Sequence, residues 1–248
     1  MNSPHADSPV AIVTGAAGGI GAAVVDRLLA DGFTVCATDL ESAIDGRWDS
    51  SARLISRPHN VASEVEWAEL VEFISEQLGR IDVLVNNAGV GGRADVETET
   101  VEGWNRVVSI NQQGVWLGMR AVGAMMRSQG SGSIVNVSSV FGHTGGRGDM
   151  FAYHATKGAI LAMTKNAAVL WGRDGVRVNS VDPGFVETPS VLRNLDEGGR
   201  GEWILANTPL GRLARVEEIA AAVAFLAGPE STYATGASFL IDGGWTAR

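Results

Sequence analysis

The sequence predicts an α/β fold: a single-domain, Rossmann-like, doubly wound arrangement in which a seven-stranded parallel sheet carries helices on both faces. Three observations predict it. Short β-branched runs alternate with helix-length segments along the 248 residues. These runs are apolar at consecutive positions, as strands buried on both faces are. A glycine-rich turn joins the first run to the first helix, as in nucleotide-binding βαβ units.

The predicted strands are short and rich in valine, isoleucine and threonine. They are Val10–Thr14, Thr34–Thr38, Arg53–Ser56, Ile81–Val85, Ser133–Val137, Arg177–Val181 and Ser238–Ile241. The chain between them is long enough for crossover helices. Right-handed crossovers place the carboxyl ends of the strands at one edge of the sheet, where such folds bind their ligands.

The predicted helices separate these strands. Glu64–Leu78 has the clearest signal, because Ser63 and Glu66 fit a capping box and apolar residues follow at helical spacing. The others are Ala22–Ala30, Val101–Ser128, Phe151–Trp171 and Val216–Leu226. No linker or internal repeat interrupts the alternation. We therefore expect a flexible segment at residues 1–9 and one Rossmann-type catalytic domain at residues 10–248.

Composition argues against several classes of protein. The formal net charge of −9 disfavours nucleic acid and anionic membranes as partners. A single cysteine, Cys36, excludes an internal disulfide, and no apolar run is long enough to span a bilayer. The short polar start lacks the core of a signal peptide, so we expect a cytoplasmic protein. His5, His59 and His143 have no partners at metal-ligand spacing, which predicts no metal site.

The glycine-rich turn Gly15–Gly21 (GAAGGIG) follows the first predicted strand directly. A helix start presents backbone N–H groups and a partial positive charge, and glycine lets a pyrophosphate approach the backbone. Asp39 closes the second strand, where a ribose-binding carboxylate belongs in a dinucleotide fold. Tight turns also use glycine, and Asp39 alone could be a solvated strand end. Together they predict a dinucleotide-binding site.

A tyrosine and a lysine define a second site. Tyr153 and Lys157 lie four residues apart, on one face of the predicted helix Phe151–Trp171. Such a spacing also arises by chance as a surface pair. Here the preceding predicted strand ends at Ser138 and Ser139, so hydroxyl, phenol and ammonium groups can meet at the carboxyl edge of the sheet.

Taken in order, these residues resemble the compact branch of the short-chain dehydrogenase/reductase family over nearly the whole chain. The likeness rests on the following segments: Thr14–Gly21, Asn86-Asn87-Ala88-Gly89, Asn111, Ser139, Tyr153 with Lys157, Pro183-Gly184 with Thr188, Pro209-Leu210-Gly211-Arg212 and Asp242-Gly243-Gly244.

The resemblance implies an NAD-dependent oxidoreductase that interconverts a secondary alcohol and a ketone. Tyr153 would be the general acid/base and Ser139 would hydrogen-bond the substrate oxygen. Lys157 would hold the nicotinamide ribose, and Asn111 would anchor a water that relays protons. A free tyrosine has a pKa of about 10, so we expect the Lys157 ammonium to lower the pKa of Tyr153 by roughly three units.

The resemblance also implies which residues contact the cofactor. They are Gly15, Gly19, Ile20, Gly21, Asp39, Leu40, Asn60, Val61, Asn87, Ala88, Gly89, Tyr153, Lys157, Pro183, Gly184, Val186 and Thr188. Asn60 stands where the family often has aspartate beside the adenine, which keeps an acceptor and loses a charge. Ala17, Gly18, Leu40 and Glu41 offer no cation for a 2′-phosphate, so we expect NAD in preference to NADP.

The substrate is expected to be a compact hydrophobic or cyclic secondary alcohol or ketone, because apolar residues surround the predicted pocket. These are Val140, Phe141, Met150, Phe151, Phe185, Val191, Leu192 and Trp203. The Ser190–Asn207 stretch mixes glycines and charges and is expected to be a mobile lid. His154 should point away from the Tyr153 face and be structural.

Three other functions are weighed against this one. An NADPH-dependent 3-ketoacyl-thioester reductase tends to carry a basic residue in the glycine loop. Enzymes that release halogen from halohydrins lack an intact cofactor loop. A non-catalytic NAD-sensing protein would have a damaged Asn-Ser-Tyr-Lys set, which is complete here. The resemblance further implies a homotetramer, with the helix Gly114–Met126 and the C-terminal segment as interfaces.

Overall fold

A parallel seven-stranded sheet organises the computed structural model, which describes residues 8–44, 48, 53–195 and 197–248. The strand order is β3-β2-β1-β4-β5-β6-β7, and every neighbouring pair is parallel. The chain reverses its direction of winding between β1 and β4, which is where a doubly wound sheet binds its ligand. The fold class is as predicted. Residues 1–7 of the expected flexible segment lie outside the described part.

The strands match the predicted ones to within one or two residues at each end. They are β1 (Val10–Thr14), β2 (Thr34–Asp39), β3 (Leu54–Pro58), β4 (Val83–Asn86), β5 (Gly132–Val137), β6 (Val176–Pro183) and β7 (Ser238–Ile241). The largest extension is in β6, which pairs with β5 on one side and with β7 on the other. Pairing on both sides carries the strand two residues past its predicted end.

The main helices are α1 (Gly19–Ala30), α3 (Glu64–Leu78), α4 (Val101–Val107), α5 (Gly114–Gln129), α6 (Phe151–Trp171) and α9 (Val216–Ala227). Shorter ones are α2 (Glu41–Ile44), α7 (Pro189–Leu192) and α8 (Arg200–Asn207). The helix predicted over Val101–Ser128 is present as one helical run, but a π-helical turn at Val108–Gln113, which was not predicted, lies between α4 and α5.

The predicted capping box at α3 is half formed. Ser63 Oγ accepts a hydrogen bond from the Glu66 N–H at 3.3 Å, as expected. The Glu66 carboxylate, however, accepts from the Asn60 N–H at 2.7 Å instead of returning to Ser63. The tight turn between Asn60 and Ser63, closed by their own backbone hydrogen bond of 2.9 Å, brings the Asn60 N–H within reach.

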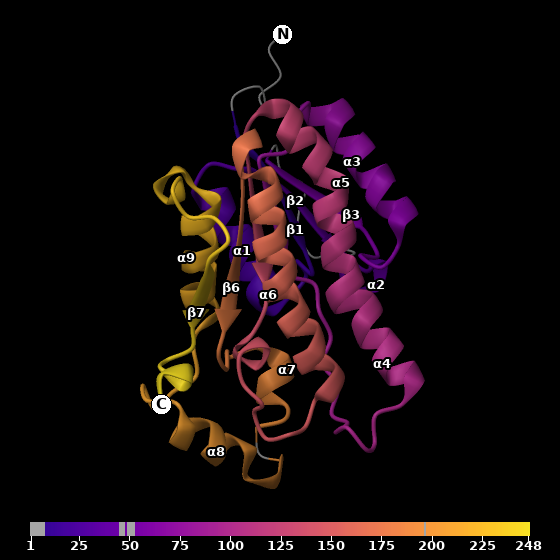
Figure 1. Cartoon of the computed structure of the whole chain (residues 1–248). Coiled ribbons are helices and arrows are strands. Elements are labelled where there is room, and N and C mark those ends of the chain that lie inside the picture. The colour runs from indigo at the N-terminus through magenta and orange to yellow at the C-terminus, as the bar shows by residue number, and fades with distance from the viewer. Residues whose placement is uncertain (1–7, 45–47, 49–52, 196) are drawn as a thin grey trace.

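Helices cover both faces of the sheet (Figure 1), and the alternation of side chains along the strands divides the core accordingly. In β1, Ala11 and Val13 belong to a cluster with side chains of α1 and α9. Val10 and Ile12 belong to the opposite cluster, with side chains of α3, α5 and α6. These strand residues are fully buried. Because side chains alternate between the two packed faces, the face toward which the last residue of each strand points is fixed.

The loops that follow β1, β4, β5 and β6 all leave the sheet at the same edge. In Figure 1 this edge lies at the bottom of the view, where α7 and α8 pack beneath the strands. Within the described residues, no helix has both the length and the hydropathy needed to cross a bilayer.

Candidate active site

A groove of about 680 Å³ lies outside the carboxyl ends of β1, β2 and β4. Most of the predicted cofactor residues line it: Gly15, Gly19, Ile20, Asp39, Leu40, Asn60, Val61, Asn87, Ala88, Gly89 and Thr188. Its position coincides with the reversal of the strand order, so the predicted dinucleotide residues meet where this fold binds nucleotides.

The glycine loop has backbone geometry that side chains would destroy. A Cβ on Gly21 would lie 2.1 Å from the Gly15 carbonyl oxygen, and Gly15 itself has a φ of +63°. Gly18 has nothing within 4 Å of where a Cβ would be, and it precedes α1 without a side-chain cap. The first N–H groups of α1 are therefore available to an anion. The loop fits the pyrophosphate of a dinucleotide.

Two side chains tie this loop to the neighbouring strand. Thr14 Oγ1 accepts hydrogen bonds from the N–H groups of Asn87 and Ala88, both at 3.1 Å. The Asn87 amide donates in return to the carbonyls of Thr14 and Gly15, at 2.9 and 3.0 Å. Asn87 thus fixes the start of the glycine loop directly, through the two carbonyl oxygens that precede its turn.

Asp39 lies at the end of β2, as predicted, and its carboxylate is already engaged. One oxygen accepts from the Ala17 N–H at 2.9 Å and the other from the Leu40 N–H at 2.8 Å. The side chain is partly exposed and lines the groove. Each carboxylate oxygen retains a free lone pair, so the group can accept from a ribose hydroxyl as well.

Several groove residues were not assigned a cofactor role from the sequence, and His59 and Arg193 are two of them. His59 is 4% exposed, and its Nε2 has no hydrogen-bond partner among the described residues. Burial lowers the pKa of His59 to about 4, so the ring is neutral near pH 7. A buried polar atom without a partner fits a site that a polar ligand completes. Arg193 adds a cation to the groove wall beyond Thr188.

A second cavity, of about 340 Å³, contains Ser139 and Tyr153. Ser139 follows β5, and its Oγ accepts from the Phe141 N–H at 3.2 Å. Burial raises the pKa of Tyr153, and the hydrogen bond with Ser139 opposes this with a smaller effect. The predicted lowering of the tyrosine pKa is therefore wrong for the protein alone. The Lys157 Nζ lies 5.4 Å from the Tyr153 ring centroid, within the range of a cation–π contact.

Lys157 is a buried cation on α6. Its Nζ donates to the Val137 carbonyl at 2.7 Å, and burial lowers the pKa of Lys157 to about 8. The Asp182 carboxylate favours the charged ammonium and offsets part of this fall. Asp182 is fully buried and pairs with His143 Nε2 at 2.7 Å. Neither His143 nor Asp182 was assigned a site role from the sequence, although Asp182 directly precedes Pro183-Gly184.

Asn111 occupies the π-helical turn and is fully buried. Its side-chain amide accepts from the Val90 N–H at 2.8 Å and donates to the Val90 carbonyl at 2.9 Å. A Cβ on Gly89 would lie 3.4 Å from Asn111 Oδ1 and 3.8 Å from Lys157 Nζ. Asn111 thus reaches the Lys157 neighbourhood, but its amide is committed to the backbone. Its part in a water relay stays a prediction.

The remaining predicted cofactor residues line no part of the groove. Gly21 packs against Gly15, and Pro183 lies within β6. Val186 is 3% exposed and belongs to the core, and Gly184 lines the second cavity.

His154 is structural, as predicted, stacked on Phe141 with its Nδ1 2.9 Å from the Met150 carbonyl oxygen. Among the described residues, no three His, Cys, Asp or Glu side chains gather as metal ligands.

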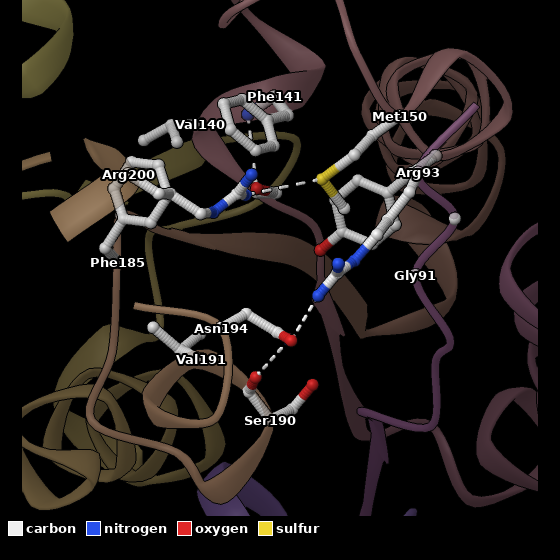
Figure 2. A pocket seen from close by; sticks show the side chains of 14 residues that line it. Gly91, Arg93, Val140, Phe141, Met150, Phe185, Ser190, Val191, Asn194 and Arg200 are labelled. Carbon is white, nitrogen blue, oxygen red and sulfur yellow. Dashed lines mark hydrogen bonds between the residues drawn. The ribbon is translucent and has the colours of Figure 1, made fainter. Parts of the chain in front are cut away.

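The second cavity is apolar in part. Val140, Phe141, Met150, Phe185 and Val191 line it as predicted. The predicted wall residues Phe151, Leu192 and Trp203 do not, because Trp203 for example packs on Phe185 and Trp245. Apolar residues therefore form only part of the wall. Ser190, Asn194, Arg93 and Arg200 also line the cavity (Figure 2).

Met150 has a φ of +61°, in the left-handed region that favours glycine, and no other described non-glycine residue has a positive φ. It begins α6 and projects into the cavity between Arg93 and Phe141 in Figure 2. Backbone strain of this kind costs about 1–3 kcal/mol and tends to persist at ligand sites.

Comparison with known proteins agrees with this geometry. A family model described as enoyl-(acyl carrier protein) reductase matches residues 15–246. A 2-(R)-hydroxypropyl-CoM dehydrogenase of Xanthobacter autotrophicus is 40% identical, over 97% of this chain and 99% of its own. A cis-4-hydroxycyclohexanecarboxylate dehydrogenase of Sinomonas cyclohexanicum is 38% identical over 96% of both chains. The 3-oxoacyl-[acyl-carrier-protein] reductase FabG of Thermotoga maritima is 40% identical, over 96% and 98%.

Solved structures agree as well. The crystal structure of levodione reductase superposes with a TM-score of 0.91 at 34% identity, covering 96% of this chain and 98% of the other. The fold is therefore shared over 96% of this chain.

The electrostatic coupling between Asp182 and Lys157 can be measured directly, because Lys157 and Lys165 are the only lysines in the sequence. In protein labelled with ¹³C-lysine, we expect the Lys157 Cε resonance to titrate near pH 8. Asp182→Asn removes the charge that favours the ammonium, so the midpoint should fall further. The exposed Lys165 resonance serves as an internal reference that the substitution leaves in place. An unchanged Lys157 midpoint would show that Asp182 does not act on the ammonium.

Proposed function

This chain belongs to the short-chain dehydrogenase/reductase family, and we propose that it is an NAD-dependent enzyme that interconverts a compact, cyclic or hydrophobic secondary alcohol and its ketone. The observation that carries the proposal is the meeting of Ser139 and Tyr153 in one cavity beside a groove shaped for a dinucleotide. The names of the Sinomonas and levodione relatives support a cyclic substrate.

A bound nicotinamide ring supplies the hydride acceptor or donor. Ser139 donates a hydrogen bond to the substrate oxygen and stabilises the charge that develops there. Tyr153 carries the proton that leaves the alcohol or reaches the ketone. Because burial raises its pKa, the phenol is protonated near neutral pH in the free protein, which is the state that donates a proton to a ketone.

Lys157 contributes in two ways. Its ammonium is held against the Val137 carbonyl and places a positive charge near the phenol. This charge stabilises the anionic form of Tyr153 and so favours deprotonation of the phenol during oxidation. Its remaining N–H donors are available to a ribose hydroxyl.

The test of the mechanism is Tyr153→Phe, which removes the proton carrier and little else. We expect kcat to fall by ~10² or more while NAD binding, measured by calorimetry, is retained. Lys157→Ala should weaken both, since the ammonium serves the phenol and the cofactor. Near-normal turnover by Tyr153→Phe would overturn the proposed mechanism. Cofactor binding without turnover by the unmodified protein, over a broad alcohol and ketone screen, would favour an NAD-sensing role.

The proposed preference for NAD over NADP depends on Asp39. Its carboxylate lines the groove at the end of β2, where it can accept from the adenosine ribose hydroxyls. A charge-assisted bond of this kind contributes about 1.5–3 kcal/mol. A 2′-phosphate would remove a donor and bring a second anion against the carboxylate. The groove cation Arg193 is the C-cap of α7, and it comes from a part of the chain far from β2.

We therefore expect kcat/KM to be about a hundredfold higher with NAD than with NADP, which corresponds to ~3 kcal/mol. Asp39→Ala combined with Leu40→Arg should narrow or reverse the ratio by removing repulsion and supplying a phosphate partner. Steady-state kinetics with both cofactors decide this. Equal use of NADP by the unmodified protein would mean that Asp39 serves the loop through Ala17 only.

A second function, reduction of 3-ketoacyl thioesters with NADPH, is favoured by one observation, the similarity to the Thermotoga reductase. The glycine loop has Ala17 and Gly18 where such enzymes tend to carry a basic residue. Acetoacetyl-CoA reduction with NADPH that exceeds the oxidation of cyclic alcohols with NAD would select this second function.

The expected homotetramer is part of the proposal. Trp116 on α5 and Leu170 on α6 are 47% and 66% exposed, and both line a shallow cavity of about 590 Å³ between these helices. Light scattering should give four times the 25.9 kDa chain. Leu170→Glu should reduce the particle to a dimer or monomer, whereas Val65→Glu on the exposed face of α3 should not. A 25.9 kDa particle from the unmodified protein would contradict the assembly.

A further inference from the structure

The cavity that holds Ser139 and Tyr153 is lined by two arginines, Arg93 and Arg200. Among the described residues that line it, none is acidic. An uncharged alcohol would need no arginine at this cavity, since apolar contacts and one hydrogen bond to its hydroxyl would hold the alcohol. Two cations at a substrate cavity attract an anionic group of a substrate, and the absence of a lining carboxylate leaves that attraction unopposed within the described lining.

Arg200 lies at the start of α8, and its side chain is 22% exposed. Its Nη1 donates to Asp149 Oδ2 at 3.1 Å, and its Nη2 contacts the Met150 sulfur at 3.7 Å. A guanidinium has five N–H donors, so three have no acceptor among the described residues. The ion pair with Asp149 is single and not bidentate, and Asp149 does not line the cavity. Arg200 can therefore donate hydrogen bonds to an anion in the cavity.

Arg93 comes from the loop between β4 and α4, on the other side of the cavity. It donates to the side-chain carbonyl of Asn194, whose own amide donates to the Ser190 carbonyl at 2.7 Å. Figure 2 shows Arg93 and Arg200 extending toward the cavity from opposite sides of the view, with Met150 between them. The two guanidinium groups thus lie on the wall of the cavity that Ser139 and Tyr153 also line.

We propose that the substrate carries a carboxylate, held by Arg200 and Arg93 while its carbinol carbon lies at Ser139 and Tyr153. The proposal rests on the proposed function for the alcohol end and adds the anionic end. Arginine suits this task, because its planar donors match the two oxygens of a carboxylate. The apolar wall between the two ends, including Phe141, Met150 and Phe185, would hold a compact cyclic frame.

Binding tests the anionic end without any turnover. Cyclohexanecarboxylate and cyclohexanecarboxamide have the same shape and differ in charge. We expect the carboxylate to bind the intact protein, with NAD present, at least tenfold more tightly by calorimetry. The difference should shrink as salt is raised, because the arginines are partly exposed. Equal binding of both ligands, or binding of neither, would overturn the proposal.

Three substitutions separate recognition from structural support. Arg200→Gln should reduce carboxylate affinity about tenfold or more and leave the carboxamide unchanged. Asp149→Asn breaks the same ion pair but keeps the guanidinium, so it should not weaken the carboxylate. Arg147→Gln removes a nearby cation that packs over Trp203 outside the cavity, and it should change neither affinity. Equal losses in Arg200→Gln and Asp149→Asn would show that the pair only supports α8.

Kinetics then link this site to the reaction. With 4-hydroxycyclohexanecarboxylate and its carboxamide as substrates, Arg93→Gln and Arg200→Gln should each raise KM for the acid at least tenfold more than KM for the amide. Turnover of both substrates with no preference for the acid would overturn the proposal and leave the proposed function standing. Selective binding of the carboxylate with no turnover of either alcohol would do the reverse.

Discussion

Parallel pairing of every strand is the constraint on which the rest of the molecule depends. Parallel strands must all be crossed by helices on the way back, so each carboxyl end emerges at the same edge and each loop there is free to carry function. The glycine loop, Asp39, Asn87, Ser139 and Gly184 are brought together by this rule alone, although they span 170 residues. The two cavities are neighbours because β1, β4, β5 and β6 are consecutive in the sheet.

Within that frame, the site contains charges that a buried environment disfavours. The Lys157 ammonium loses solvation, and the protein offsets this through the Val137 carbonyl and the buried Asp182 carboxylate. Burial raises the pKa of Asp182, and the hydrogen bonds from His143 and nearby serine hydroxyls oppose this rise. Such a chain of compensated charges leaves the ammonium close to its titration point, where small electrostatic changes alter its protonation.

The sequence predicts the sheet, the crossover helices and the residues of the nucleotide loop well, since periodicity and glycine placement are local signals. It predicts irregularities within helices less well: the π-helical turn around Asn111 leaves no signal in the periodicity, and the Val90 backbone that Asn111 binds is 21 residues away. The direction of the Tyr153 pKa could not be predicted, because desolvation depends on packing from several elements. Arg93 and Arg200 were missed for the same reason, as they reach the cavity from separate loops.

The support given to the glycine loop by Asn87 has a consequence for biosynthesis. The amide that binds the Thr14 and Gly15 carbonyls stands 73 and 72 positions further along the chain. A ribosome therefore releases β1, α1 and β2 long before the residue that fixes the loop between them, and domains form as the chain emerges from its amino terminus. The nucleotide-binding half of this fold is in this respect not a detachable module: its phosphate loop reaches its final geometry only when the fourth strand has been made and docked.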